Sequence, residues 1–282
     1  MAGSSMKDIK LRIKSVESTM QITKAMQLVA TSKLRRAKER MESSKPYTQV
    51  AGAAMQAAIA SCSRDGTVPY STRRPLKKRC FVVIAGDRGL AGGYNNNIFK
   101  AVRAYGDDVP CCTMPVGLKA VDFCQRAGLE PLSRDFTRVE GMTVPACYRM
   151  AQQLLKAYDA GEFDELVLVY TDFRNMLSQD VTTEVLLPLT VPEDAASRAV
   201  SVEYEPAADE LLRQVMDDFL AGRLYSAICD SFASEVAARR NAMNSATTNA
   251  EAMISDLRLR YNRARQGSIT QEITEIVAGA EQ

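Results

Sequence analysis

The longest stretch free of helix-breaking residues lies at the C-terminal end of the chain. Pro206 is the last proline, and between it and Gly279 only Gly222 and Gly267 interrupt residues that favour helices. Apolar residues recur there every three or four positions, as on one face of a helix, among them Leu212, Met216, Phe219, Tyr225, Ile228, Phe232, Val236, Ala250, Ile254 and Leu257. A helix of about 70 residues would be roughly 100 Å long. Such a helix needs a second long element to pack against.

The N-terminal segment supplies that second element. Between Lys7 and Lys45 there is no glycine or proline. The core positions alternate steps of four and three, which is heptad spacing: Ile9, Ile13, Val16, Met20, Thr23, Gln27, Ala30, Leu34, Ala37 and Met41. A second apolar line, Ile22, Met26 and Val29, is expected to widen this stripe. We therefore predict an antiparallel two-helix coiled coil formed by the N- and C-terminal helices.

The middle of the chain is predicted to form a small α/β domain. Buried-strand runs at 80–85 and 166–170 alternate with helical segments at 94–105, 118–126 and 145–160. Strands that alternate with helices predict a mostly parallel, Rossmann-like sheet. The predicted boundaries are an N-terminal coiled-coil helix at 1–62, a linker at 63–78, the α/β domain at 79–206 and the C-terminal helix at 207–282. Pro46 is expected to bend or end the first helix.

Charge is distributed unevenly along the chain. Residues 7–45 hold eleven basic and four acidic residues, and residues 239–265 hold six and two, whereas the whole chain has a net charge of only +2. This pattern indicates an acidic partner for the long helices, with a solvated basic face as the alternative. No apolar run approaches the roughly 18 residues of a membrane span, and the N-terminus lacks the apolar core of a secretory signal. A cytosolic location is expected.

Little in the sequence indicates a metal site or nucleophilic catalysis. The seven cysteines include no C-x-x-C pair, and the chain has no histidine. We therefore expect no metal, no disulfide framework and no Ser-His or Cys-His catalysis.

The glycine-rich segment after the first strand is the one place that resembles a phosphate-binding loop. Gly86, Gly89, Gly92 and Gly93 do not have the spacing of either standard nucleotide fingerprint. A structural turn is therefore favoured, and a nucleotide-dependent α/β enzyme with a coiled-coil arm remains an alternative. The basic run 258–265 leaves nucleic-acid binding as a third possibility.

The last part of the C-terminal helix changes character after Arg265. Residues 266–277 include no basic residue and several β-branched apolar ones. Such a tip suits insertion into an apolar collar on another protein. The alternative is that it folds back on the middle domain.

Three segments carry a resemblance to a known family. They are ITKAMQLVATSKL at 22–34, GDRGLAGGYN at 86–95 and YNRARQGSITQEITEI at 261–276. They resemble, in the right order, signature segments of the gamma subunits of F-type (rotary) ATP synthases.

The resemblance implies a central rotor shaft without catalytic or cofactor-binding residues of its own. Its implied partners are the α and β subunits of the catalytic ring, the epsilon subunit and the membrane-embedded c-subunit ring, and nucleic acid is not among them. The implied location is the cytoplasmic face of the bacterial plasma membrane. The thiol switch of the plastid form is not expected, because only a short connection joins Leu187 to Pro206.

The resemblance also implies which residues meet the α/β ring. Met26, Lys24 and Lys33 would face an acidic loop of the β subunit, Arg265 and Gln266 would bond to other β-subunit loops, and 269–277 would turn in an apolar bearing. The full set of expected ring contacts is Lys24, Met26, Lys33, Arg239, Arg265, Gln266, Ile269, Ile273, Ile276 and Val277.

Overall fold

The computed structural model describes residues 6–65, 68–106, 108–192 and 207–280. The chain forms two compact units. One combines Met1–Thr31 with Arg239–Gln282 and is called here the helix-pair unit, and the other, Ser32–Ala238, is called the sheet unit. The elements in chain order are α1 (Met6–Asp65), β1 (Arg79–Ile84), α2 (Tyr94–Gly106), β2 (Cys111–Val116), α3 (Leu118–Arg126), β3 (Glu130–Pro131), α4 (Val144–Asp159), β4 (Glu165–Phe173), β5 (Gln179–Leu187) and α5 (Ala208–Ala280).

The sheet has five strands in the order β3-β2-β1-β4-β5. β1 pairs in parallel with β2 and β4, and β2 pairs in parallel with β3, whereas β5 runs antiparallel to β4 at the edge. This arrangement confirms the predicted, mostly parallel α/β sheet. β1 is buried at every position because helices cover both of its faces.

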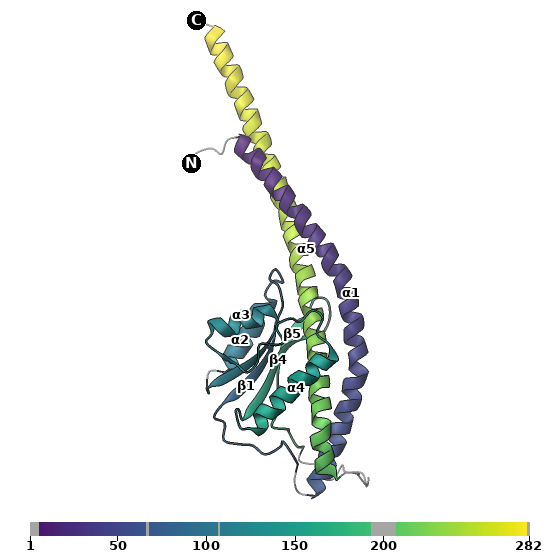
Figure 1. The fold of residues 1–282 in the computed structure, drawn as a ribbon. Coiled ribbons are helices and arrows are strands. Elements are labelled where there is room, and N and C mark those ends of the chain that lie inside the picture. Colours follow the sequence, from purple (N-terminus) through teal and green to yellow (C-terminus); the bar gives the residue numbers. More distant parts are fainter. Residues whose placement is uncertain (1–5, 66–67, 107, 193–206, 281–282) are drawn as a thin grey trace. The chain divides into compact units, whose positions relative to one another are not determined.

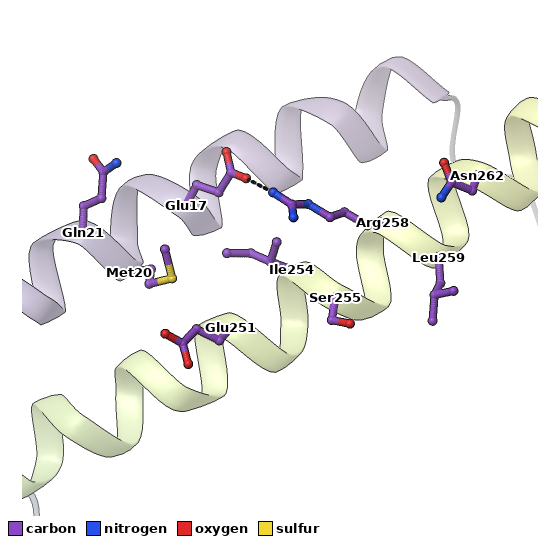
Figure 2. A pocket seen from close by; sticks show the side chains of 9 residues that line it. All are labelled: Glu17, Met20, Gln21, Glu251, Ile254, Ser255, Arg258, Leu259 and Asn262. Atoms are coloured by element: carbon purple, nitrogen blue, oxygen red, sulfur yellow. Dashed lines mark hydrogen bonds and ion pairs between the residues drawn. The ribbon is translucent and has the colours of Figure 1, made fainter.

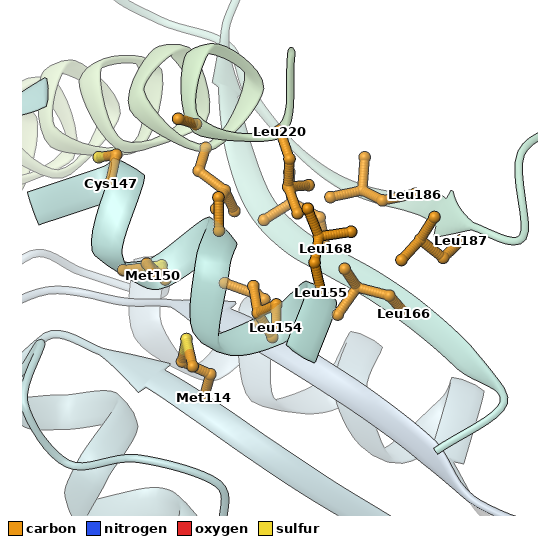
Figure 3. Close-up of a cluster of buried hydrophobic side chains, with 14 of the residues drawn as sticks. Met114, Cys147, Met150, Leu154, Leu155, Leu166, Leu168, Leu186, Leu187 and Leu220 are labelled. Atoms are coloured by element: carbon orange, nitrogen blue, oxygen red, sulfur yellow. The ribbon is translucent and has the colours of Figure 1, made fainter. Parts of the chain in front are cut away.

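Alternate residues of β1 point into two separate cores. Phe81 and Val83, with Ala85 just after the strand, face α2 and α3, where Phe99 stacks on Phe123 with ring centroids 4.3 Å apart. The opposite face packs against α4 and against the parts of α1 and α5 that belong to the sheet unit (Figure 1). Figure 3 shows this second core, in which leucines of α4, β4 and β5 meet Leu220 of α5.

α5 also supplies polar groups where β1 ends. The pairing of β1 with β4 stops at Val169. Two residues further along β4, the backbone N–H of Thr171 donates to Ser231 Oγ at 3.0 Å, and Ser234 Oγ donates to the Thr171 carbonyl at 3.3 Å. The two serines thus satisfy backbone groups that would otherwise be buried without partners.

Pro46 neither ends nor visibly divides the first helix. α1 is continuous for 60 residues with Pro46 inside it. Helix-breaking by proline costs roughly 3 kcal/mol. Buried contacts on both sides of it, at Met41, Ser44 and Met55, offset that cost.

In the helix-pair unit, residues 6–31 of α1 run antiparallel to α5. The predicted spacing buries Ile9, Thr23 and Ala30 on α1. The facing residues of α5 are Met243, Thr247, Ala250, Ile254 and Leu257. The second apolar line is not part of this seam, because Ile22 and Val29 are each 58% exposed. Within the described ranges, no helix combines the length and apolar character needed to cross a membrane.

Candidate interaction surface

At the centre of the seam in the helix-pair unit, the residues that meet are small or polar. Thr23 Oγ1 lies 2.8 Å from Thr247 Oγ1, and Gln27 Nε2 donates to Asn244 Oδ1 at 3.0 Å. These pairs set an antiparallel register in which Glu17 meets Arg258, 2.9 Å apart. Ile254 and Leu257 are buried in the seam, whereas other large side chains, such as Ile22 and Val29, lie on the outer faces of the helices.

The α1 residues expected to contact a partner lie on that outer surface or beside it. Lys24 is exposed and Met26 is half-buried. Ile22, Leu28 and Val29 are exposed large apolar side chains over the same turns. This part of α1 thus presents apolar surface together with a positive charge.

Lys33 belongs to the sheet unit and has an internal partner. Its ammonium forms an ion pair with Glu140, and the two side chains remain 40% and 48% exposed. An exposed ion pair of this kind contributes only about 0–1 kcal/mol. Lys33 can therefore exchange Glu140 for another carboxylate at little cost. Sequence reasoning did not identify Glu140, because no local pattern connects residues 107 positions apart.

The α5 residues expected to contact a partner form two groups. Arg239 is half-buried, whereas Arg265 and Gln266 are exposed. Further along, Ile269, Ile273 and Ile276 are 46%, 56% and 71% exposed. The side chain of Val277 lies outside the described residues. All side chains from 271 to 276 are exposed, so the tip forms an apolar stripe that nothing in the described helix-pair unit covers.

A groove of about 660 Å³ lies between the two helices of this unit. Met20 of α1 and Ile254 of α5 point toward one another at its floor, and the ion pair of Glu17 with Arg258 crosses it (Figure 2). Exposed Glu251 also lines it.

The glycine-rich segment after β1 is a turn held by internal contacts. The carboxylate of Asp87 accepts hydrogen bonds from the backbone N–H groups of Val139 (3.1 Å) and Glu140 (3.0 Å), and weakly from Leu118 (3.4 Å) in the first turn of α3. The Asp87 carboxylate therefore ties the turn to residues 139–140 and to the first turn of α3.

Close packing explains two of the glycines near that turn. A Cβ on Gly86 would lie 2.8 Å from the carboxyl carbon of buried Glu235. Gly117 has φ +99°, and a Cβ there would lie 2.0 Å from the Ala85 carbonyl oxygen. These contacts favour the structural role of the turn over a nucleotide site.

Comparison with known proteins agrees with this geometry along nearly the whole chain. A family model described as ATP synthase matches residues 5–282. The ATP synthase gamma chain of Ruminococcus albus is 41% identical over 278 residues, which cover 97% of this chain and 96% of that protein. The chain belongs to the ATP synthase gamma-chain family.

Other gamma-chain relatives and solved structures agree. The gamma chain of Lachnoclostridium phytofermentans is 40% identical, with 98% of each chain covered. A chain in the central stalk and c-ring structure of Tetrahymena thermophila mitochondrial ATP synthase has 25% identity and a TM-score of 0.64, covering 80% of this chain and 99% of that one. A chain of the Euglena gracilis mitochondrial ATP synthase rotor, at 17% identity and a TM-score of 0.64, shares the fold and covers 94% of this chain and 98% of that one.

Proposed function

We propose that this chain is the central rotor shaft of an F-type ATP synthase. It carries rotation between the membrane-embedded c-subunit ring and the surrounding ring of α and β subunits, while catalysis resides on those other subunits. The observation that carries the proposal is the exposed apolar tip of α5, with Ile269, Ile273 and Ile276 open to solvent. A stripe of large apolar side chains at helical spacing marks a protein interface.

The contacts along the shaft follow from the chemistry of each segment. The isoleucine stripe turns in an apolar bearing of the α/β ring. Arg265 and Gln266, exposed one turn before it, bond to polar loops of the β subunits. Lys24, Met26 and Lys33 meet an acidic β-subunit loop, and Arg239 adds a further ring contact.

The remaining partners are inferred from the complexes that contain structural relatives of this chain. The structure with the Tetrahymena relative is described as central stalk and c-ring, and that with the Euglena relative as rotor. We infer that the sheet unit docks on the epsilon subunit and the c-subunit ring. Because the gamma chains named above are bacterial, the inferred location is the cytoplasmic face of the plasma membrane.

Assembly with tagged α and β subunits tests this function. The chain is expected to co-purify with the ring and to have no ATPase activity alone. In the assembled complex, Ile269→Ser, Ile273→Ser and Ile276→Ser combined should weaken retention of the chain by at least about tenfold, because burial of a large aliphatic side chain contributes about 1.5–3 kcal/mol. Gln271→Ser with Glu275→Ser, which shortens two polar side chains of the same turns, is the control.

Two results would contradict the proposal. One is ATP turnover by the purified chain that survives removal of all ring subunits. The other is a ring that assembles, hydrolyses ATP and couples to proton movement equally well with the triple serine variant.

A further inference from the structure

The segment that connects α1 to β1 is unusually basic and unusually exposed. Residues 73–79 read RRPLKKR, and every residue from Thr72 to Lys77 is exposed. Its backbone is nevertheless held in place. The carbonyl of Tyr70 accepts a hydrogen bond from Leu189 at 2.8 Å, and the N–H groups of Lys77 and Lys78 donate to Asp164. The segment is thus an ordered surface, which lowers the entropy cost of binding.

A recess of about 290 Å³ opens beside this segment. Its apolar lining is Leu76, Val185, Pro188 and Leu189, and its polar lining is Arg73, Arg74, Asp164, Glu165 and Thr190. We call it the linker recess. It combines room for an apolar side chain with guanidinium groups within the same small volume.

The charges around the linker recess do not cancel. Asp164 accepts from two backbone N–H groups, and Glu165 pairs with buried Arg79. Arg74 donates to the Tyr158 carbonyl at 2.9 Å and stacks over its ring, so its charge is not neutralised by a carboxylate. Among the described residues, the guanidinium of Arg73 and the ammonium of Lys77 have no partner. Glu165 is compensated by Arg79, so in the lining the two positive charges of Arg73 and Arg74 face the single negative charge of Asp164. The lining therefore keeps a surplus of one positive charge, to which neighbouring Lys77 adds another.

We propose that the linker recess is a docking site for an acidic protein segment that carries an apolar side chain next to an aspartate or glutamate. The apolar side chain fills the space between Leu76 and Leu189, and the carboxylate binds the guanidinium of Arg73. The proposal rests on the proposed function for its source, since a stalk chain must hold its neighbours firmly enough to pass on rotation. The segment therefore belongs to another subunit of the assembled complex.

Site-specific photo-cross-linking in the assembled complex tests this. A photoactivatable residue replaces Leu76, and the matched control replaces Leu118, a leucine of the same unit with similar exposure (38% and 41%). The expected product from position 76 joins a subunit segment with an aspartate or glutamate near the adduct. Position 118 should not capture that segment. No inter-chain product from position 76, products only within the same chain, or a captured segment without acids would each overturn the proposal.

Charge removal gives an independent measurement. Arg73→Ala with Lys77→Ala should slow association of the captured subunit about tenfold at low salt, because charges at an interface rim act mainly on the association rate. The difference should disappear near 1 M salt, where the screening length is about 3 Å. Arg134→Ala with Lys100→Ala removes the same charge from exposed positions outside the recess and should change the rate less than twofold. Equal effects of the two pairs would overturn the proposal.

Flotation with lipid vesicles distinguishes binding to a protein from binding to a membrane. If Arg73→Ala with Lys77→Ala abolishes flotation of the complex with anionic phospholipid vesicles and leaves subunit association unchanged, the site binds lipid and the proposal is wrong. Failure of the unaltered chain to join α and β subunits would instead contradict the proposed function. A complex that assembles without any contact at position 76 contradicts only the recess.

Discussion

The hydroxyl oxygens of Thr23 and Thr247 lie 2.8 Å apart, although 224 residues separate them in the chain. Each hydroxyl also lies within hydrogen-bond distance of a carbonyl of its own helix, Met20 at 3.0 Å and Met243 at 2.9 Å. A hydroxyl has one proton to donate, so only two of these three contacts form at once. One threonine donates across the seam while the other donates within its own helix.

This contact predicts that the effects of substituting the two threonines on stability are coupled. Thr23→Val and Thr247→Val should each reduce the unfolding free energy by about 1 kcal/mol, because each change removes the hydrogen bond between helices. The double variant should lose less than the sum, since both single changes remove the same hydrogen bond between the helices, which can be lost only once. Thermal unfolding of the four proteins gives the coupling energy. Thr19→Val, an exposed threonine that donates only to Ser15 of its own helix, is the control. Strict additivity would show that the contact across the seam contributes nothing.

Gly117 is predicted to be the least replaceable of the glycines with positive φ. Its φ is +99° and an added Cβ would overlap a backbone oxygen, which has no rotamer through which to move away. Gly117→Ala should therefore cost about 3 kcal/mol or more of unfolding free energy. Gly128→Ala, at φ +67° with no atom within 4 Å, should cost only about 1–2 kcal/mol. Urea unfolding measures both, and similar losses would contradict the predicted overlap.

Asp87 is predicted to hold the segment 139–140 through its charge. Asp87→Asn keeps one acceptor oxygen but loses the carboxylate, so it should cost about 1–3 kcal/mol. Amide hydrogen exchange at Val139 and Glu140 should accelerate together with this loss. Asp122→Asn, which removes an exposed carboxylate paired only with Lys119, serves as the control. Unchanged exchange at residues 139 and 140 would show that other contacts hold the segment.

Asp230 is predicted to make stability depend on pH. It is 7% exposed on α5, and burial, followed by the nearby charge of Asp172, raises its pKa from 3.8 to about 6, against the opposing charges of Lys45 and Arg223. A carboxyl whose pKa is higher in the folded state stabilises the fold below its unfolded pKa. That contribution is lost as the pH rises through about 6. Ionisation at neutral pH then costs about 3 kcal/mol as an order of magnitude.

Asp230→Asn should accordingly be more stable than the natural chain at neutral pH and no more stable near pH 4. Urea unfolding across this range is the measurement, with Asp209→Asn, exposed on the same helix, as the control. A variant that is less stable than the natural chain at neutral pH would show that the Asp230 carboxylate is stabilised there by its basic neighbours.

Local sequence patterns were sufficient to predict most of the helices and strands. The helix predicted at 118–126 has these bounds in the structure, and the strand predicted at 166–170 lies within β4. Heptad spacing likewise identified Thr23 and Ala30 as buried. These features depend on residues three to nine positions apart, which a sequence displays directly. The domain boundaries and the individual ring contacts remain predictions.

Other features could not be predicted from local patterns, because the residues that cause them are distant in the chain. The spacing of apolar residues suggested that Ile22 and Val29 widen the seam, yet both are exposed. Pro46 was expected to bend or end α1, and the helix does not end there but continues to Asp65. Glu140 and Asp87 act through partners on segments that only the fold brings near them.

The sequence by itself therefore determined the helices, the strands, the family and the concentration of positive charge on the terminal helices, because periodicity, turn residues and motifs are properties of neighbouring positions. The tertiary structure decided which charges are free and which are already paired. Lys33 meets Glu140 and Glu165 meets Arg79, whereas Arg73 remains without a partner among the described residues. Charge pairing depends on distances in space, and folding alone sets those distances.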